Sequence, residues 1–392
     1  MSIRSYIKGR SSIKKYAYGA RRVLYYSMLA INRPWKTDKM KVLLNNFQGK
    51  GYAGNPRAIA ESLHRMNPDV KLLWVCDGDK SAESLPPYVK PVSIDSANYY
   101  HEVATSGTWV FNILPARGLL KRKDQLYIQT YHGDRSPKKL HYQNVGKKET
   151  DYKYAIHDEI CDYGVTGSAV GERMFREAIG FHGKLLKFGM PRNDCLVNID
   201  EELCREIRSK LGLTEDEYLV LYAPTFRQGE SQLKCEINFD RLLDVLEQKT
   251  GKKCICLYRA HFHTNNISFS QQDNNRMINV SGYTDMADLL MIADMLITDY
   301  SSSAGDFCVK HKPVILFMDE TETYNRKLLY DIAETPHFIA HNQDELEELV
   351  SELDEEKTEK NCDELIKFFG IYDSGQASMK VSEVILDHID KN

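Results

Sequence analysis

Short apolar runs alternate with amphipathic helical stretches along most of this chain. Apolar runs that predict strands lie at 41–47, 71–76, 108–112, 125–130, 163–166 and 184–188, and again at 218–222, 254–258, 295–298 and 313–317. Stretches with helical periodicity lie at 55–66, 201–211, 239–249, 285–293 and 304–310, and acidic helices fill 343–390. Apolar strands that alternate with helices are typical of parallel sheets covered by helices. The pattern therefore predicts an α/β protein.

The length of the chain predicts more than one hydrophobic core. A chain of 392 residues exceeds the size at which a single core usually stops growing, so we expect two domains. The strand pattern divides into two similar halves joined by the helical stretch at 201–211. We therefore predict two doubly wound, Rossmann-like domains, 40–205 and 206–392, with helices closing the second.

The segment 1–39 differs from the rest in its charge. No acidic residue precedes Asp38, whereas these basic residues do: Arg4, Lys8, Arg10, Lys14, Lys15, Arg21, Arg22, Arg33 and Lys36. Tyrosines and aliphatic residues lie between them, a mixture that suits an amphipathic helical segment on an anionic membrane surface. The alternative is a basic helix that packs on its own domain. We favour the membrane interpretation, because the acid-free stretch is long for a nearly neutral protein.

Composition narrows the class of protein further. The net charge of −4 gives no reason to expect nucleic acid as a partner. The nine cysteines form no CxxC pair, which favours cytosolic thiols over a zinc site. No apolar run has transmembrane length and no cleavable signal is present, so we expect a peripheral protein on the cytoplasmic face of the membrane.

Residues 296–303, with the sequence LITDYSSS, join a buried strand to an acid, an aromatic ring and three hydroxyls just before a helix. Free backbone N–H groups and the positive end of a helix dipole attract anions at such a point. Serine hydroxyls add donors, so phosphate is the ligand that we expect. An N-cap serine in an ordinary loop is the structural alternative.

Similar polar clusters follow other predicted strands. They lie at 48–54, 131–139 and 189–194 in the first half, and at 223–227, 259–263 and 298–303 in the second. Ligands of open parallel sheets bind beyond the carboxyl ends of the strands. Two such rims that face each other predict a cleft for a ligand with a doubly charged phosphate group.

The cluster at 48–54 also fits a different class of protein. Its glycines match GxGxxG between a strand and a helix: Gly49, Gly51 and Gly54. With Asp77 after the next strand, this is a dinucleotide fingerprint and suggests a nicotinamide-dependent oxidoreductase. Bulky Lys50 and Tyr52 in the turn, and the basic clusters that this class leaves unexplained, favour a flexible glycine loop at the cleft mouth.

Two clusters carry histidines that suit proton transfer or phosphate binding. His132 follows a strand, and its neutral imidazole can remove a proton from a hydroxyl, with Asp134 nearby to orient it. A rate that depends on this base should fall below about pH 6. His261 and His263 suggest a zinc pair, but no third ligand has suitable spacing. We therefore assign His261, together with Arg259, to a diphosphate.

Together, these motifs resemble the CDP-glycerol glycerophosphotransferase family of teichoic-acid primases and polymerases. The matching pieces are GYAGNP at 51–56, His132-Gly133 with Lys138-Lys139, GMPRND at 189–194, APTFR at 223–227, Arg259-Ala-His261, and LITDYSS at 296–302 with Asp306. They span about 42–335 and are specific in their order and spacing.

The resemblance implies a GT-B fold with the active site between two Rossmann-like domains. It implies transfer of glycerol phosphate, or a related polyol phosphate, from a CDP-polyol to a hydroxyl of a lipid-linked or polymeric acceptor, with release of CMP, in the synthesis of teichoic-acid-like or capsular polymers. His132 would be the general base. The residues expected to bind substrate are Gly133, Arg192, Thr225, Arg227, Arg259, His261, Asp299, Ser301, Ser302 and Asp306; the two aspartates would position the sugar or polyol.

One departure and two alternatives accompany this interpretation. Many members carry Thr-Pro-Leu-Lys after His-Gly, whereas residues 134–138 here read DRSPK, in a region expected to touch the transferring group or the acceptor. A sugar-nucleotide glycosyltransferase or epimerase would share the fold, and the oxidoreductase is the third class. We expect no metal or other cofactor, because fixed donors at a helix start can stabilise phosphate charge and no DxD-type cluster is placed to hold a metal.

Overall fold

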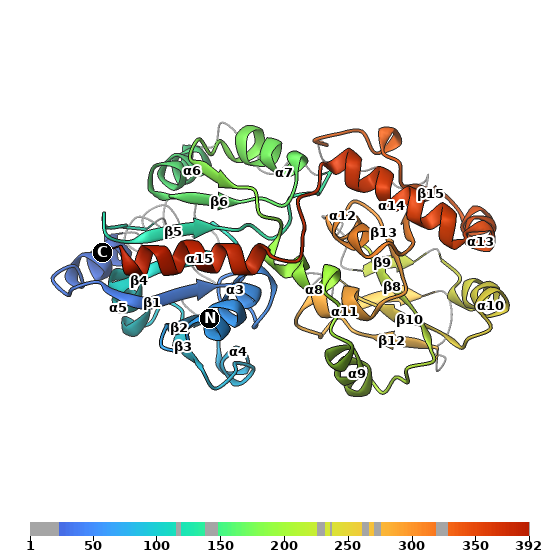
Figure 1. The fold of residues 1–392 in the computed structure, drawn as a ribbon, viewed down its shortest axis with the longest axis horizontal. Coiled ribbons are helices and arrows are strands. Elements are labelled where there is room, and N and C mark those ends of the chain that lie inside the picture. The colour runs from blue at the N-terminus through green and yellow to red at the C-terminus, as the bar shows by residue number, and fades with distance from the viewer. Residues whose placement is uncertain are drawn as a thin grey trace, which may run out of the picture.

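The chain folds into two lobes, each built on a parallel sheet covered by helices (Figure 1). The computed structural model describes residues 23–114, 119–137, 148–225, 232–235, 237–260, 266–269, 276–318 and 328–391. The first sheet contains β1 (Asp38–Asn45), β2 (Lys71–Cys76), β3 (Val89–Ser93), β4 (Ser106–Phe111), β5 (Leu126–Gln129), β6 (Tyr163–Val165) and β7 (Lys184–Leu186). The second contains β8 (Tyr218–Ala223), β10 (Cys254–Tyr258), β12 (Met277–Asn279), β13 (Met295–Thr298), β14 (Val314–Phe317) and β15 (Phe338–Ala340), and a small separate sheet pairs β9 (Gln232–Cys235) with β11 (Asn266–Phe269).

Both main sheets are doubly wound. The strand orders are β3-β2-β1-β4-β5-β6-β7 and β12-β10-β8-β13-β14-β15, and the strands in each are parallel. The order reverses between β1 and β4 and between β8 and β13, the points where such folds bind ligands. The predicted pair of doubly wound α/β domains is confirmed.

The strands that apolar runs predicted are the buried ones. β2, β10 and β13 have the predicted bounds, and all six residues of β4 are buried. Within the two main sheets, the strands that the sequence did not predict are the edge strands β3, β12 and β15; it also did not predict β9 and β11 of the small separate sheet. The three edge strands are short and only partly buried, and β3 contains Pro91, so none of them carries a long apolar run.

The helices follow their strands as a parallel sheet requires. In the first half they are α3 (Gly54–Met66), α4 (Asp79–Glu83), α5 (Ala97–Thr105), α6 (Lys148–Ile160), α7 (Ala169–Arg173), α8 (Asp194–Val197) and α9 (Glu201–Lys210). The later helices are α10 (Phe239–Thr250), α11 (Met286–Ile292), α12 (Ser303–Phe307), α13 (Gln343–Glu352), α14 (Glu355–Phe369) and α15 (Ala377–Asp390). η2 (Met174–Ile179) is a π-helix, and η3 (Pro191–Asn193), η4 (Cys308–Lys310) and η5 (Ile332–Glu334) are short 3₁₀ helices. Ser168 is the N-cap residue of α7, and Pro56 is at the third position of α3, because Ala53 is the N-cap residue there.

The last helix returns to the first lobe. Figure 1 shows the chain crossing from α14 to α15, which lies beside α3. Val381 and Ile385 of α15 are fully buried in the core that contains Val42 and Ile59. The predicted boundaries, 40–205 and 206–392, stay a prediction, and the structure adds that α15 packs on the first half although it follows the second.

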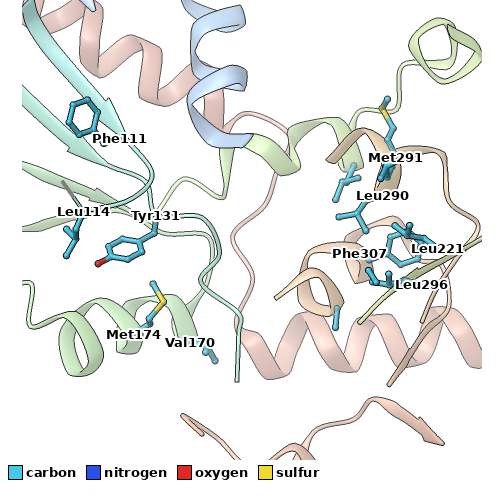
Figure 2. Close-up of a cluster of buried hydrophobic side chains, with 14 of the residues drawn as sticks. Phe111, Leu114, Tyr131, Val170, Met174, Leu221, Leu290, Met291, Leu296 and Phe307 are labelled. Atoms are coloured by element: carbon cyan, nitrogen blue, oxygen red, sulfur yellow. The ribbon is translucent and has the colours of Figure 1, made fainter. Parts of the chain in front are cut away.

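Apolar side chains also pack on both sides of the junction between the lobes. Figure 2 shows Phe111, Leu114 and Tyr131 on the side of the first sheet. Leu290 and Phe307 lie on the side of the second sheet, in the same buried cluster. These two groups support the loops that carry the predicted site residues.

A helix over 23–31 packs on α5 through one face. Tyr25 and Leu29 are buried, and the Tyr25 ring lies 5.5 Å from the Tyr100 ring. Exposed apolar side chains of this segment form an outer apolar face, consisting of Val23, Leu24 and Ile31 in the helix and Trp35 beyond its end, each more than 60% exposed. Within the described part of the chain, no helix has the length and hydrophobicity needed to span a membrane.

Candidate active site

His132 lies three residues beyond the buried end of β5, next to the switch point of the first sheet. Its Nδ1 is 3.2 Å from the main-chain oxygen of Asn112, which follows β4. A carbonyl oxygen only accepts, so Nδ1 must carry the proton, and the neutral ring therefore has its lone pair on Nε2. The Phe47 ring packs against the imidazole with centroids 4.9 Å apart. The structure thus holds His132 in the tautomer that a general base needs.

The surroundings of His132 keep it neutral. Burial lowers the pKa of His132 from 6.5 to about 4; the bond to Asn112 opposes this effect and the charge of Arg192 adds to it. The neutral, proton-accepting form is therefore dominant well below neutral pH. The sequence predicted that the rate would fall below about pH 6. The pKa of about 4 predicts that the rate falls near pH 4 instead.

The predicted orienting role of Asp134 is wrong. Its Oδ2 accepts from the Thr166 hydroxyl at 3.0 Å and the Gly167 amide at 2.6 Å. The Asp134 side chain is buried. The main-chain carbonyl of Asn112, which no motif indicated, orients His132 instead.

The two halves meet closely beside His132. Arg192, in η3, donates through Nη1 to the main-chain oxygen of His132 and through Nη2 to Asp306 of α12. A Cβ added to Gly133 would lie only 2.5 Å from the Ser302 hydroxyl oxygen. The structure therefore brings five predicted residues from the two halves together: His132, Gly133, Arg192, Ser302 and Asp306.

Ser301 and Ser302 precede α12, as predicted. The Ser301 hydroxyl accepts from the amide of Ser303 at 3.3 Å and from its hydroxyl at 2.8 Å. Ser302 is the N-cap residue, but its side chain makes no capping hydrogen bond. Both serines are partly exposed. The N-cap alternative explains Ser301 better than Ser302, because only the Ser301 hydroxyl accepts from a backbone amide at the start of α12.

Asp299 and Thr225 form a second group at the switch point of the second sheet. The carboxylate of Asp299 accepts from the Thr225 amide at 2.9 Å and from the Thr225 hydroxyl at 3.1 Å. Both residues are buried, and both follow adjacent strands, β8 and β13. The pair fixes the two strand ends next to the Ser301 loop.

Arg259 follows β10 and retains unused donor capacity. Its Nη2 donates to the main-chain oxygen of Thr284 at 3.3 Å, whereas its buried Nη1 has no hydrogen-bond partner in the described part of the chain. Burial lowers the pKa of the guanidinium, and Asp285 and Asp288 oppose that shift. The predicted partners Arg227 and His261, like His263 and Lys138-Lys139, lie outside the described residues.

The glycine loop packs against the second half. Gly54 donates its amide to Asp285 at 3.0 Å, and Arg57 Nη1 lies 3.1 Å from Asp285 and 2.9 Å from Asp288. A Cβ on Gly51 would lie 2.5 Å from Thr284 Cγ2. The sequence missed this ionic contact, because nothing in its pattern pairs α3 with the start of α11. Within the described residues, no group of three or more histidine, cysteine or carboxylate side chains is placed to hold a metal ion.

Comparisons with known proteins agree with this geometry. The teichoic acid poly(glycerol phosphate) polymerase of Staphylococcus epidermidis is 29% identical over 371 residues, which cover 89% of this chain and 51% of that protein. The teichoic acid glycerol-phosphate transferase of Staphylococcus aureus is 29% identical over 377 residues, covering 89% and 93%. The chain thus spans about half the length of some curated relatives that it matches.

Solved structures and a family model extend the match to nearly the whole chain. The wall teichoic acid polymerase TagF matches with a TM-score of 0.83 and 25% identity, over 100% of this chain and 99% of that one. A TagF variant soaked with CDPG matches with a TM-score of 0.79 and 25% identity, over 97% and 98%. The family model described as CDP-Glycerol:Poly(glycerophosphate) glycerophosphotransferase matches residues 25–387. The chain therefore belongs to the CDP-glycerol:poly(glycerophosphate) glycerophosphotransferase family.

Proposed function

We propose that this chain transfers glycerol phosphate, or a related polyol phosphate, from a CDP-polyol to a hydroxyl of a polymeric or lipid-linked acceptor. CMP is the other product, and the polymer is of the teichoic-acid or capsular type. The carrying observation is the close approach of Gly133, the neighbour of the neutral base His132, to Ser302 of the other half, where residue 133 has no room for a side chain. A base and phosphate donors on opposite sides of one junction suit phosphoryl transfer.

The arrangement supports a direct displacement. The acceptor hydroxyl loses its proton to Nε2 of His132 while its oxygen forms a bond to the β-phosphorus, which bears the polyol. The bond between the β-phosphorus and the bridging oxygen breaks, and its electron pair remains on the phosphate of CMP. Positioned donors stabilise that charge without reorganising, and each is worth ~3 kcal/mol.

The donor groups that we assign lie mainly in the second half. Ser301 and Ser302 offer hydroxyls, and the Nη1 of Arg259 is an unused buried donor. Arg227 and His261 are assigned to the same diphosphate from the family motif. Asp299 and Asp306 are fully engaged with protein donors, so we assign them to holding Thr225 and Arg192 in place near the donor. No metal or other cofactor is part of this assignment.

Donor binding tests the proposed function against its alternatives. Isothermal titration of the purified chain with CDP-glycerol, CDP-ribitol, UDP-glucose and NADH should give binding for a CDP-polyol only. Binding of UDP-glucose would favour the sugar-nucleotide transferase or epimerase. Binding of NADH would favour the oxidoreductase. The packing of the glycine loop on Thr284 favours the proposed function over the oxidoreductase.

We propose further that segment 1–39 holds the enzyme on an anionic membrane surface, on its cytoplasmic face. The outer apolar face supports this assignment, because its four large apolar side chains are each more than 60% exposed. The basic side chains Arg33 and Lys36 lie in the same segment, and each contributes about 1 kcal/mol near anionic lipid.

Liposome flotation tests the membrane assignment. Replacing the outer apolar face by serine should release the protein from vesicles that contain phosphatidylglycerol, and high salt should do the same, because salt screens the surface charge. Val197→Ser with Ile199→Ser is the matched control, since these exposed apolar side chains lie elsewhere on the surface. Equal flotation of the two variants would contradict the assignment.

A further inference from the structure

The departure from the family pattern after His132-Gly133 lies in a buried ionic cluster between the halves. Asp134 and Arg135 are 1% and 0% exposed. The sequence led us to expect that residues 134–138 touch the transferring group or the acceptor. The structure contradicts this for Asp134 and Arg135, because neither side chain reaches the surface.

Arg135 contacts three separate segments of the chain. Its Nη1 donates to the main-chain oxygen of Gly305 at 3.2 Å and to Asp306 at 3.1 Å, both in α12. Its Nη2 donates to the main-chain oxygen of Gly167 at 3.0 Å and to Asp373 at 2.6 Å. One guanidinium therefore joins the second half, the first half and the crossing to α15.

The backbone beside Arg135 is held by the second half as well. The Tyr330 hydroxyl donates to the main-chain oxygen of Arg135 at 2.7 Å, and the Leu329 amide donates to that of Pro137. A Cβ on Gly305 would lie 2.8 Å from the Cβ of Arg135, so this loop and α12 are in direct contact. The loop that carries His132 is thus fixed to the element that follows the donor serines.

A continuous series of hydrogen bonds and ion pairs connects this cluster to the His132 base. Asp306 pairs with Arg135 through Oδ1 and with Arg192 through Oδ2, and Arg192 donates to the main-chain oxygen of His132. Asn193 also donates to Asp306 at 3.0 Å and to Asp373 at 2.9 Å. Removing one partner from such a buried network leaves charge without compensation.

We propose that Arg135 is a positioning residue for the transfer. It sets the distance between the His132 base and the donor groups at α12, so that the acceptor oxygen meets the β-phosphorus in line. The inference rests on the proposed function. It assigns Asp134 and Arg135, which depart from the family pattern, to holding the two halves together rather than to selecting the acceptor. A displacement of about 1 Å between reacting groups lowers a rate by about 10²-fold.

Arg135→Met tests the role in catalysis. The single-turnover rate with CDP-glycerol should fall about 10- to 100-fold, whereas the donor dissociation constant should change less than about threefold, because the donor groups lie in the second half. Arg208→Met is the matched control: this arginine is also largely buried and donates to carbonyls of Thr214, Glu217 and Ile292, away from the junction. Its rate should stay within about threefold of the wild type. Equal rate losses in the two variants would overturn the proposal.

A double variant separates positioning from stability. Arg135→Met with Asp373→Asn removes both charges, so it should recover most of any loss in Tm while the rate stays low. Recovery of the rate together with Tm would show a purely structural role and overturn the proposal.

Hydrogen exchange gives a readout that does not need turnover. The Leu329 amide, which bonds across to Pro137, should exchange faster in Arg135→Met and remain protected in Arg208→Met. Unchanged protection at Leu329 would overturn the proposal even if CDP-glycerol proves not to be the donor. A wild-type chain that is inactive with every CDP-polyol would instead contradict the proposed function.

Discussion

The low pKa of His132 makes the acid limb of the pH–rate profile a quantitative test of its role as the base. At pH 5.5 an imidazole with the ordinary pKa of 6.5 is about 9% neutral, whereas one with a pKa of about 4 is about 97% neutral. The kcat/KM for the CDP-polyol reports the free enzyme. It should therefore stay nearly constant from pH 7 to pH 5.5 and fall to half near pH 4.

The same shift predicts a difference in stability. The folded pKa lies below the unfolded value, so protons bind the unfolded chain more tightly, and stability falls as the pH drops through 6.5 toward 4. At pH 5 this amounts to about 2 kcal/mol. His132→Gln removes the titrating group, so it should lose less stability than the wild type between pH 7 and pH 5 in urea unfolding.

Stopped-flow CMP release after a brief pH jump provides the assay, with His132→Gln as the control for other titrations. The residual rate of the variant should not follow the wild-type limb. A wild-type limb centred near pH 6.5 would refute the reasoning that burial and Arg192 keep His132 neutral. A limb near pH 4 that persists in His132→Gln would assign the titration to another group.

Two further predictions concern the junction, and a third concerns metal ions. Replacing Ser301 and Ser302 by alanine should weaken CDP-polyol binding at least about tenfold in calorimetry with the fold intact, and unchanged affinity would contradict their assignment. Gly133→Ala should slow turnover about tenfold or more, since its Cβ would lie 2.5 Å from the Ser302 hydroxyl, whereas Gly282→Ala, whose Cβ meets nothing within 4 Å, should not. Dialysis against EDTA should leave CMP release unchanged, and a loss of rate that Mg²⁺ restores would show a metal requirement.

The sheets were predictable because the central strands of a parallel sheet are buried on both faces. β2, β10 and β13 are short apolar runs, so their bounds could be read from hydropathy alone. The edge strand β3 has only two buried residues, separated by two exposed ones, and includes Pro91, so its pattern resembles a loop. The place of α15 was not predictable either, because an amphipathic helix does not specify which of two cores covers its apolar face.

The site was predictable only to the level of which loops take part. The family motifs pointed to the His132 and Ser301 loops, and the structure brings Gly133 against Ser302. The partners within those loops were not predictable, since a charged residue such as Arg135 is usually exposed. Its burial depends on Asp373, which lies 238 positions later in the chain. Likewise, the atom that orients His132 is a main-chain oxygen, which leaves no trace in side-chain identity.

The central claim is that this chain transfers a polyol phosphate from a CDP-polyol with His132 as the base. The most direct measurement combines single-turnover transfer from radiolabelled CDP-glycerol with donor affinity, for the wild type and His132→Ala side by side. We expect CMP and a glycerol-phosphate-extended acceptor in equal amounts from the wild type. His132→Ala should show a rate lower by about 10²- to 10⁴-fold and near-normal donor affinity. Near-normal turnover by His132→Ala, or no transfer from any CDP-polyol by the wild type, would contradict it.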